Sequence, residues 1–515
     1  MAEQVQVYTI TAPGFYGLNT QDSSLDLSSG FALIANNCVI DQYGRVGARK
    51  GWTKVNSSLN TDLSTNNITS MGELITTDAT SYTILAGNNK LFKLSGTSLV
   101  TLTYGGGGVA PTISASNWQM VSLAGALYLF QSGHDPLVFD PSLSTTTYRR
   151  ISELTGYGGT VQLGNTAISA YGRIWTADVS SDKVTVQWCD TKLANKWGSG
   201  TAGTLDTTTV WPRGGDQIVA LGAHNGFLFI FGKNNILVYQ GATTPSTMSL
   251  QDVVTGIGCI ARDSVAHTGT DLIFLSSTGV RSALRTIQEK SMPLRDLSKN
   301  VRNDLISYVG GETLANIKSV YNSKEAFYLL TLPTYNMVYC FDLKAMLQDG
   351  AARVTTWDTI DPKSLLSKQD GTLYLGKAGY LATYTGYNDD TSTYRFQYFT
   401  NNADLGNPSA TSILKKIRAV VIGGSNQYVV FKWGYDFTGN YHSESAFIPS
   451  QTVAYYGVSE YNTTAEYSGG AALQTLSVYP TGSGKIVQTG YEADINVYPL
   501  SIQKLEIFAK EGKIY

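Results

Sequence analysis

Histidine, cysteine and other metal-binding side chains are spaced too irregularly in this sequence to form a recognisable site. None of the four histidines lies in an HxH, HExxH or HxxE pattern, which would place two ligands close together. The four cysteines are far apart and form no CxxC pair, which predicts buried free thiols rather than zinc or redox chemistry. These residues are His134, His224, His267 and His442, and Cys38, Cys189, Cys259 and Cys340.

Carboxylates and nucleophiles also lack a catalytic pattern. Glycosidases built on propellers use paired carboxylates in a central pocket, but here the acids lie mainly in turns, where Asp usually binds its own backbone. No Gly-x-Ser-x-Gly elbow occurs, and Thr481-Gly-Ser-Gly-Lys485 lacks the first glycine and the final Ser/Thr of a phosphate loop. We therefore predict no catalytic, cofactor-binding or metal-binding residues, and a protein that is not an enzyme. The turn acids include Asp135, Asp190, Asp271 and Asp370.

Composition favours strands and tight turns. Only 15% of the 515 residues are charged, whereas the chain holds 32 Tyr and 52 Gly; aromatic residues suit pleated sheets and Gly suits turns. The net charge of −2 predicts no general attraction to nucleic acid or anionic membranes. The N-terminus has no basic and apolar signal-peptide pattern, and no run of 18 apolar residues occurs. We expect synthesis in a cytoplasm.

Short apolar and aromatic strands recur through the middle of the chain at intervals of 44 to 54 residues. Many are followed by a polar turn and a second strand. A unit of about 45 residues with three or four strands is typical of a β-propeller blade. We predict an all-β fold with a propeller of about seven blades, in which these strands are the inner ones. An irregular all-β chain is the alternative. The strands begin at Tyr82, Ala126, Arg173, Phe227, Leu272, Ala326 and Thr372.

The two ends differ from the repeated middle. Residues 1–66 contain an Asn-rich hairpin signal within Gly/Ser/Asn/Thr-rich stretches, which predicts an extended N-terminal hairpin arm that crosses to a neighbouring chain. Residues 67–388 form the expected propeller. Residues 389–515 have closely spaced alternating strands and predict a C-terminal β-sandwich-like or barrel-like domain. A short helix is predicted over 295–308, because apolar residues recur there at helical spacing.

The N-terminal motif resembles the start of tail nozzle (tail tubular or hub) proteins of short-tailed bacteriophages, which are of the β-propeller type. The resemblance rests on Gly17-Leu-Asn, Ala35-Asn-Asn37 and Tyr43-Gly-Arg45, followed by Arg49-Lys-Gly51, and on Tyr394-Arg-Phe near the C-terminal domain. It covers about 60 residues. The family-motif positions that we carry forward as structural residues are Asn37, Arg45, Arg49 and Gly51.

The resemblance implies a structural virion protein of the phage tail, made in the host cytoplasm. Six copies would form a hexameric ring at the distal end of the tail. The ring would dock on tail adaptor proteins, hold tail fibres or spikes and meet the host envelope at ejection. Double-stranded DNA would pass through without specific binding, so we expect a neutral or acidic lumen.

A second hypothesis is a phage or cell-surface adhesin. Exposed Tyr and Trp side chains can stack on sugars, so propeller loops could bind host glycan. A ring-forming protein should assemble through heterologous interfaces that close by rotation, whereas an adhesin should be a monomer or a trimer.

Overall fold

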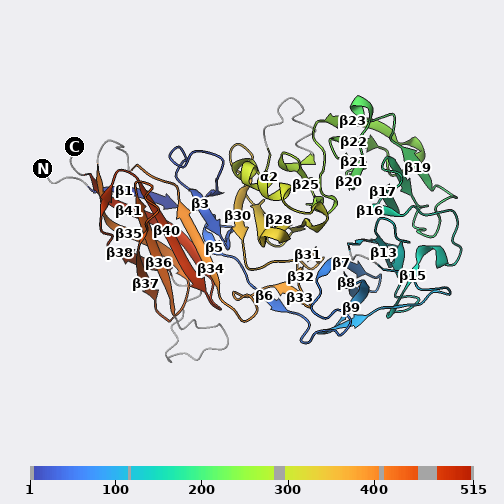
Figure 1. Ribbon diagram of the computed structural model, residues 1–515, viewed down its shortest axis with the longest axis horizontal. Helices are drawn as coiled ribbons and strands as arrows, with labels where there is room; N and C mark the ends of the chain where they lie inside the picture. The colour runs from blue at the N-terminus through green and yellow to red at the C-terminus, as the bar shows by residue number, and fades with distance from the viewer. Residues whose placement is uncertain (1–4, 114–116, 284–295, 405–410, 451–472, 512–515) are drawn as a thin grey trace.

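A propeller and a β-sandwich lie side by side in this protein (Figure 1). The structure is a computed structural model, and it describes residues 5–113, 117–283, 296–404, 411–450 and 473–511. The all-β prediction is confirmed, because strands dominate every described part of the chain. Among the described residues, none of the helices has the length and apolar character needed to cross a bilayer.

Six groups of four or five neighbouring strands form complete propeller blades within the described residues. In Figure 1 they are arranged around a common centre. The first blade has β7 (Ile68–Ile75), β8 (Ser81–Gly87), β9 (Lys90–Ser95) and β10 (Ser98–Thr101), and the second has β11 (Thr103–Tyr104), β12 (Gln119–Leu123), β13 (Ala126–Phe130), β14 (Leu137–Phe139) and β15 (Thr147–Arg150). The third blade has β16 (Gly164–Ala170), β17 (Arg173–Val179), β18 (Thr185–Trp188) and β19 (Gly203–Asp206). The fourth has β20 (Ile218–His224), β21 (Phe227–Gly232), β22 (Asn235–Gln240) and β23 (Ser249–Thr255). The fifth blade has β27 (Lys318–Asn322), β28 (Phe327–Leu332), β29 (Met337–Asp342) and β30 (Arg353–Trp357), and the sixth has β31 (Ser364–Ser367), β32 (Leu373–Gly376), β33 (Leu381–Tyr384) and β6 (Trp52–Lys54).

The expected count of seven blades is corrected to six complete ones. The unit that begins at Leu272 gives a sheet of only three strands in the described part of the chain. After it, the chain forms helix α2 (Arg302–Gly310), which packs against β26 where a further strand would lie. Leu305 and Val309 of this helix are buried in the same core as the sheet. The three strands are β24 (Ala266–His267), β25 (Leu272–Ser276) and β26 (Gly279–Ser282).

The helix expected over 295–308 is present but shifted. Residue 295 lies outside the described residues. Leu297 precedes a short 3-10 turn, η5 (Lys299–Val301), and α2 follows it. The other 3-10 turns are η1 (Ile151–Glu153), η2 (Pro212–Gly214), η3 (Pro245–Thr247), η4 (Arg262–Ser264), η6 (Leu314–Asn316) and η7 (Pro333–Tyr335).

The most apolar strand of each unit is the second strand, not the inner one. Strands β13, β25 and β28 are buried along their whole length, because neighbouring blades cover both faces of the sheet. The inner strands are more polar. They contact one another from β7 to β20 and from β24 to β31, and η4 contacts both β20 and β27. Strand β31 of the sixth blade contacts β7 of the first, which closes the ring. The inner strands are β7, β12, β16, β20, β24, β27 and β31.

The N-terminal segment is built into both lobes of the chain, contrary to the predicted arm. Strand β6 pairs with β33 and completes the sixth blade. Strands β2 (Gly17–Leu18) and β3 (Phe31–Asn36) lie between β30 of the fifth blade and β34 (Tyr394–Thr400) of the sandwich. The predicted hairpin is present as β4 (Cys38–Ile40) and β5 (Val46–Ala48), and β5 pairs with β41 (Leu500–Glu511). These strands find partners within the chain, so the segment does not extend away from it.

One ten-stranded sheet joins the propeller to the sandwich. It begins with the four strands of the fifth blade and continues through β2, β3 and β34 to β40, β36 and β37. A seven-stranded sheet forms the other layer of the sandwich. The remaining sandwich strands are β1 (Val5–Thr11), β35 (Ser412–Gly423), β36 (Gln427–Tyr435), β37 (His442–Ile448), β38 (Leu473–Val478), β39 (Ser483–Gly484) and β40 (Val487–Ile495).

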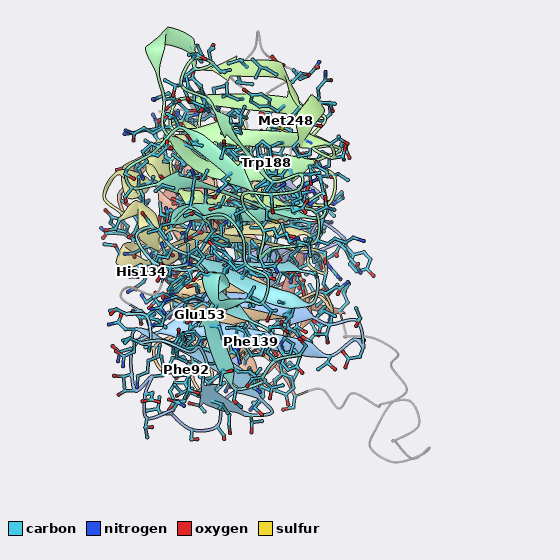
Figure 2. The ribbon with its side chains drawn as sticks, turned by 90° about the vertical axis from the view of Figure 1, so that its right-hand side faces the viewer. Phe92, His134, Phe139, Glu153, Trp188 and Met248 are labelled. Carbon is cyan, nitrogen blue, oxygen red and sulfur yellow. The ribbon has the colours of Figure 1, made fainter. Side chains whose placement is uncertain are left out.

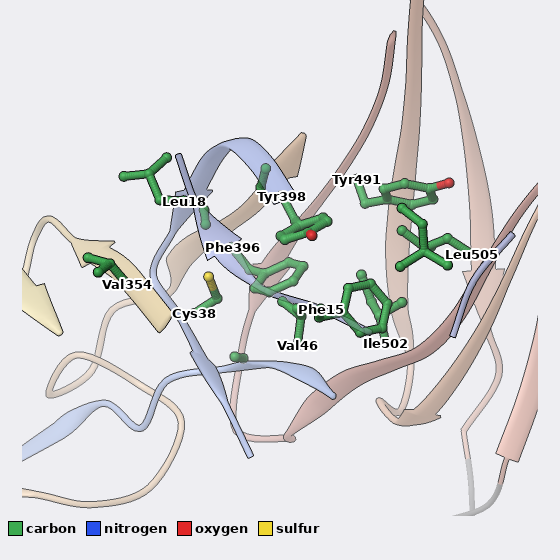
Figure 3. Close-up of a cluster of buried hydrophobic side chains, with 14 of the residues drawn as sticks. Phe15, Leu18, Cys38, Val46, Val354, Phe396, Tyr398, Tyr491, Ile502 and Leu505 are labelled. Atoms are coloured by element: carbon green, nitrogen blue, oxygen red, sulfur yellow. The ribbon is translucent and has the colours of Figure 1, made fainter. Parts of the chain in front are cut away.

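Aromatic and branched side chains fill the space between the two sandwich sheets. Phe15 and Val46 come from the N-terminal segment and meet Phe396, Tyr398 and residues of β41 (Figure 3). Smaller cores lie between neighbouring blades. Phe92, Phe139 and Trp188 contribute to three of them, on the side of the propeller that faces the viewer in Figure 2.

Deleting residues 1–54 should abolish folding of the propeller as well as the sandwich. The deletion removes β6 from the sixth blade and β2 and β3 from the ten-stranded sheet, which leaves strand edges and cores exposed. We expect an insoluble chain, or one without a cooperative urea transition followed by circular dichroism. A truncated chain with a wild-type unfolding midpoint would instead support the arm.

Candidate functional site

Three of the four family-motif residues come together where the propeller meets the sandwich. Asn37 ends the turn between β3 and β4 in a left-handed conformation, with φ of 53°. Its side-chain oxygen accepts hydrogen bonds from Arg49 Nε at 2.9 Å and from the backbone of Asp358 at 3.2 Å. Its side-chain nitrogen donates to the carbonyl of Arg395 at 2.8 Å. Asn37 therefore links the N-terminal segment to the end of the fifth blade and to β34.

Arg49 is the centre of this junction. Its side chain is fully buried and forms two parallel bonds of 2.8 Å to the Asp389 carboxylate. Nη2 also donates to Thr359 Oγ1 at 3.0 Å. The guanidinium carbon lies 4.0 Å from the centre of the Tyr394 ring. We call Asn37, Arg49, Thr359, Asp389 and Tyr394 the lobe joint.

The electrostatics of the lobe joint follow from its burial. Burial raises the pKa of Tyr394 well above the usual tyrosine range, although the Arg49 charge acts in the opposite direction. The Tyr394 hydroxyl therefore stays protonated and donates to the Arg49 carbonyl. Burial also lowers the pKa of the neighbouring Lys377 to about 8, against the opposing charges of Asp361 and Asp389. A buried ion pair of this kind is costly to break from one side, because the remaining charge is left without a partner.

Gly51 lets the chain pass close to the segment that links the two lobes. Its backbone exchanges hydrogen bonds with Thr385 and Gly386, both of 3.0 Å. A Cβ at this position would lie 1.8 Å from the carbonyl oxygen of Asn388. No side chain fits there without moving the backbone that carries Asp389.

Arg45 lies apart from the lobe joint, at the tip of the β4–β5 hairpin. Its Nε donates to Asp41 at 2.6 Å, and its guanidinium lies 4.4 Å from the centre of the Tyr43 ring. Arg45 therefore fastens its own turn. Arg45 and Arg49 belong to the same sequence motif, but Arg45 stabilises its own turn whereas Arg49 joins the two lobes.

Sequence reasoning missed the acidic partner of Arg49. Asp389 lies 340 residues away from it, at the predicted boundary between the propeller and the C-terminal domain. The available signal was that a buried arginine in an apolar hairpin needs a carboxylate. Nothing in the sequence chose between the several acids near that boundary.

A second group of charged residues, which the sequence did not predict, links several blades of the propeller. Arg262 and Asp263 lie just before β24, and the two side chains bond at 2.7 Å. Arg262 also reaches Asn165 of the third blade at 2.8 and 2.9 Å and Asn117 of the second blade at 3.0 and 3.1 Å. Lys318 of the fifth blade completes the group by donating to Asp263 and Asn117. We call these five residues the axial cluster.

The axial cluster lies at the end of the propeller where the inner strands β12, β16 and β27 begin. Arg262 is 7% exposed and Lys318 is also 7% exposed. Burial alone would raise the pKa of Asp263, but the charges of Arg262 and Lys318 outweigh it and hold the pKa below the usual range. Because its hydrogen bonds reach the second, third and fifth blades from the segment before β24, the cluster ties these parts of the ring together.

The turn carboxylates expected to bind their own backbone largely do so. Asp190 accepts from the backbone of Thr191 and Thr201, Asp271 from Leu272, and Asp370 from Thr372. Asp135 instead pairs with Arg150 at 2.9 Å.

The cysteines are buried free thiols, as the sequence predicts. All four cysteines are free and buried, and burial raises the pKa of Cys189 and Cys259 to about 11. Within the described ranges, no three His, Cys, Asp or Glu side chains gather as a metal-binding group.

Comparisons with known proteins identify no family for this chain. No protein-family model matches it, and no curated protein matches it. Similar solved structures include an extracellular domain, described as part of a one-component system, from B. thetaiotaomicron, with a TM-score of 0.40 and 12% identity over 67% of this chain and 41% of that one. Another is Kuenenia stuttgartiensis hydrazine synthase, with a TM-score of 0.37 and 11% identity over 64% of this chain and 96% of that one. A third is a family 43 arabinoxylan arabinofuranohydrolase from Bacillus subtilis, with a TM-score of 0.27 and 10% identity over 90% of this chain and 99% of that one. This chain spans about two fifths of the first protein.

Replacing Arg49 with Lys should destabilise the protein by about 2 kcal/mol or more. Lysine keeps the charge but cannot form the paired bonds to Asp389 while it also bonds Asn37 and Thr359. Arg45→Lys is the matched control, and its partly buried pair within one turn should change stability by about 0.5 kcal/mol. Urea unfolding midpoints measure both. Equal effects of the two substitutions would contradict the assignment of the lobe joint.

Gly51→Ala should cost about 2–3 kcal/mol, because the added methyl group overlaps a backbone carbonyl that cannot move cheaply. Gly107→Ala is the control, since a Cβ there meets no atom within 4 Å. Thermal unfolding compares the two variants. A Gly51→Ala protein as stable as Gly107→Ala would show that the chain crossing is looser than described.

Proposed function

We propose that this chain is a structural, non-enzymatic subunit of a short phage tail, of the nozzle type, and that six copies form a ring. The observation that carries the proposal is the lobe joint. The residues shared with the nozzle motif, Asn37, Arg49 and Gly51, are the ones that fasten the propeller to the sandwich. If the resemblance reflects a shared architecture, the motif residues should hold that architecture together, and these three residues do so.

A fixed angle between two lobes suits a ring subunit. In a ring each copy presents two different surfaces, and the rotation between them must close the circle. Flexible lobes would change that rotation from copy to copy. The continuous ten-stranded sheet and the lobe joint both oppose such motion.

In this proposal the DNA path lies between subunits. The axial cluster places bonded side chains across one end of the propeller, so we place the conduit at the axis of the ring. A chain with a net charge of −2 suits a lumen through which DNA passes without being held. The ring would contact tail adaptor proteins at one end, and fibres and the host envelope at the other.

Mass photometry of the purified chain, alone and with the tail adaptor ring from the same phage, tests this function. We expect assemblies of six copies of the 55.6 kDa chain, present at once or formed when the adaptor is added. Arg45→Lys should assemble like the wild type, whereas Arg49→Lys should be folded but assemble poorly. A persistent monomer or trimer under both conditions would favour the adhesin instead.

A further inference from the structure

A cavity of about 490 Å³ lies among the inner strands β12, β16, β20 and β24 of the propeller. This volume is within the range of small-ligand pockets, about 300–1,000 Å³. None of the described residues that line it is Asp, Glu, Lys or Arg. Its polar lining consists of Gln119, Ser169, Tyr171, His224, Asn225 and His267.

Two lining residues of the cavity lie close to the axial cluster along the chain. Gln119 lies two residues after Asn117, and Val265, another lining residue, lies three residues after Arg262. The lining also includes the ends of the inner strands β16 and β20, at Ala170 and His224.

Hydrogen bonding fixes two histidines of the wall as neutral rings. The Gly269 backbone donates to His267 Nδ1 at 3.0 Å, so the proton of His267 is on Nε2. That nitrogen lies 3.2 Å from His224 Nδ1, which must then accept and leaves the His224 proton on Nε2. Burial, followed by the neighbouring His224, lowers the pKa of His267, and Asp271 acts weakly against both. The buried Nε2 of His224 has no partner among the described residues.

Other groups of the wall are free to bind. The Gln119 side-chain oxygen accepts from the backbone of Ala167 at 2.7 Å, which fixes the amide and leaves its NH₂ group unpaired among the described residues. Ser169 and Asn225 are exposed there. The Tyr171 hydroxyl donates to the Phe227 carbonyl at 2.9 Å, which holds its aromatic ring in place.

We propose that this cavity binds a neutral saccharide. Amide, hydroxyl and imidazole groups match sugar hydroxyls, and a fixed aromatic ring beside small apolar side chains offers a surface for the CH face of a sugar ring. Without a cation in the lining, a phosphate or carboxylate would enter the cavity uncompensated. The site does not depend on ring assembly, so it adds a binding function to the proposed structural one.

The full-length chain, carrying a fluorescent label, should be tested at pH 7.5 on an array of neutral and acidic glycans. Saturation-transfer NMR with glucose, galactose, mannose, N-acetylglucosamine and fucose tests simple sugars directly. We expect binding to neutral glycans in preference to sialylated or phosphorylated ones. The absence of binding to any neutral glycan or sugar, or a preference for acidic glycans, would overturn the proposal.

Two pairs of variants locate the site. Asn225→Gly removes one amide from the rim, and glycine tolerates its φ of 49°; Asn426→Gly in the sandwich has the same φ and is the control. Ser169→Trp fills the cavity, and Ser122→Trp, exposed on the neighbouring inner strand β12, is its control. We expect Asn225→Gly to weaken binding at least threefold and Ser169→Trp at least tenfold, with both controls near wild type. Cavity variants that bind like their controls would contradict the site.

Discussion

The buried pair between Arg49 and Asp389 is the interaction on which the arrangement of the two lobes depends. It joins a hairpin at the start of the chain to the segment that leaves the propeller for the sandwich. The cost of burying two charges is offset only when geometry is good and every remaining donor is used. Asn37, Thr359 and the Lys50 carbonyl accept hydrogen bonds from those donors. The position of the hairpin is therefore fixed by directional hydrogen bonds as well as by packing.

The propeller solves a similar problem at its centre. The charged side chains of the axial cluster find partners by bonding between blades as well as to one another. The sixth blade is completed by a strand from the N-terminal segment, which ties the ring to the same segment that supplies Arg49. Closure of the propeller and attachment of the sandwich are thus two consequences of where one segment lies.

The periodic, local features of this fold were predictable from sequence. The strand repeat at Tyr82, Phe227 and Leu272 identified real units, because strongly apolar strands must be covered on both faces. The prediction that those strands are the inner ones was wrong, because periodicity does not distinguish the second strand of a blade from the first. The predicted count of complete blades was also wrong, because periodicity does not show that a helix takes the place of an outer strand. The position of residues 1–66 was also wrong, because their strand partners β30, β33 and β41 lie hundreds of residues away. In the candidate site, Asn37 and Arg49 were identified and Asp389 was not, for the same reason.

Single-molecule energy transfer between one dye on the propeller and one on the sandwich tests most directly whether the two lobes form one rigid body. Thr97 and Ser445 are exposed positions for introduced cysteines, and the four native cysteines are buried and should label poorly. We predict a single narrow transfer distribution that is unchanged by ionic strength, because the Arg49–Asp389 pair is shielded from solvent. A broad distribution, or two populations that exchange, would contradict it.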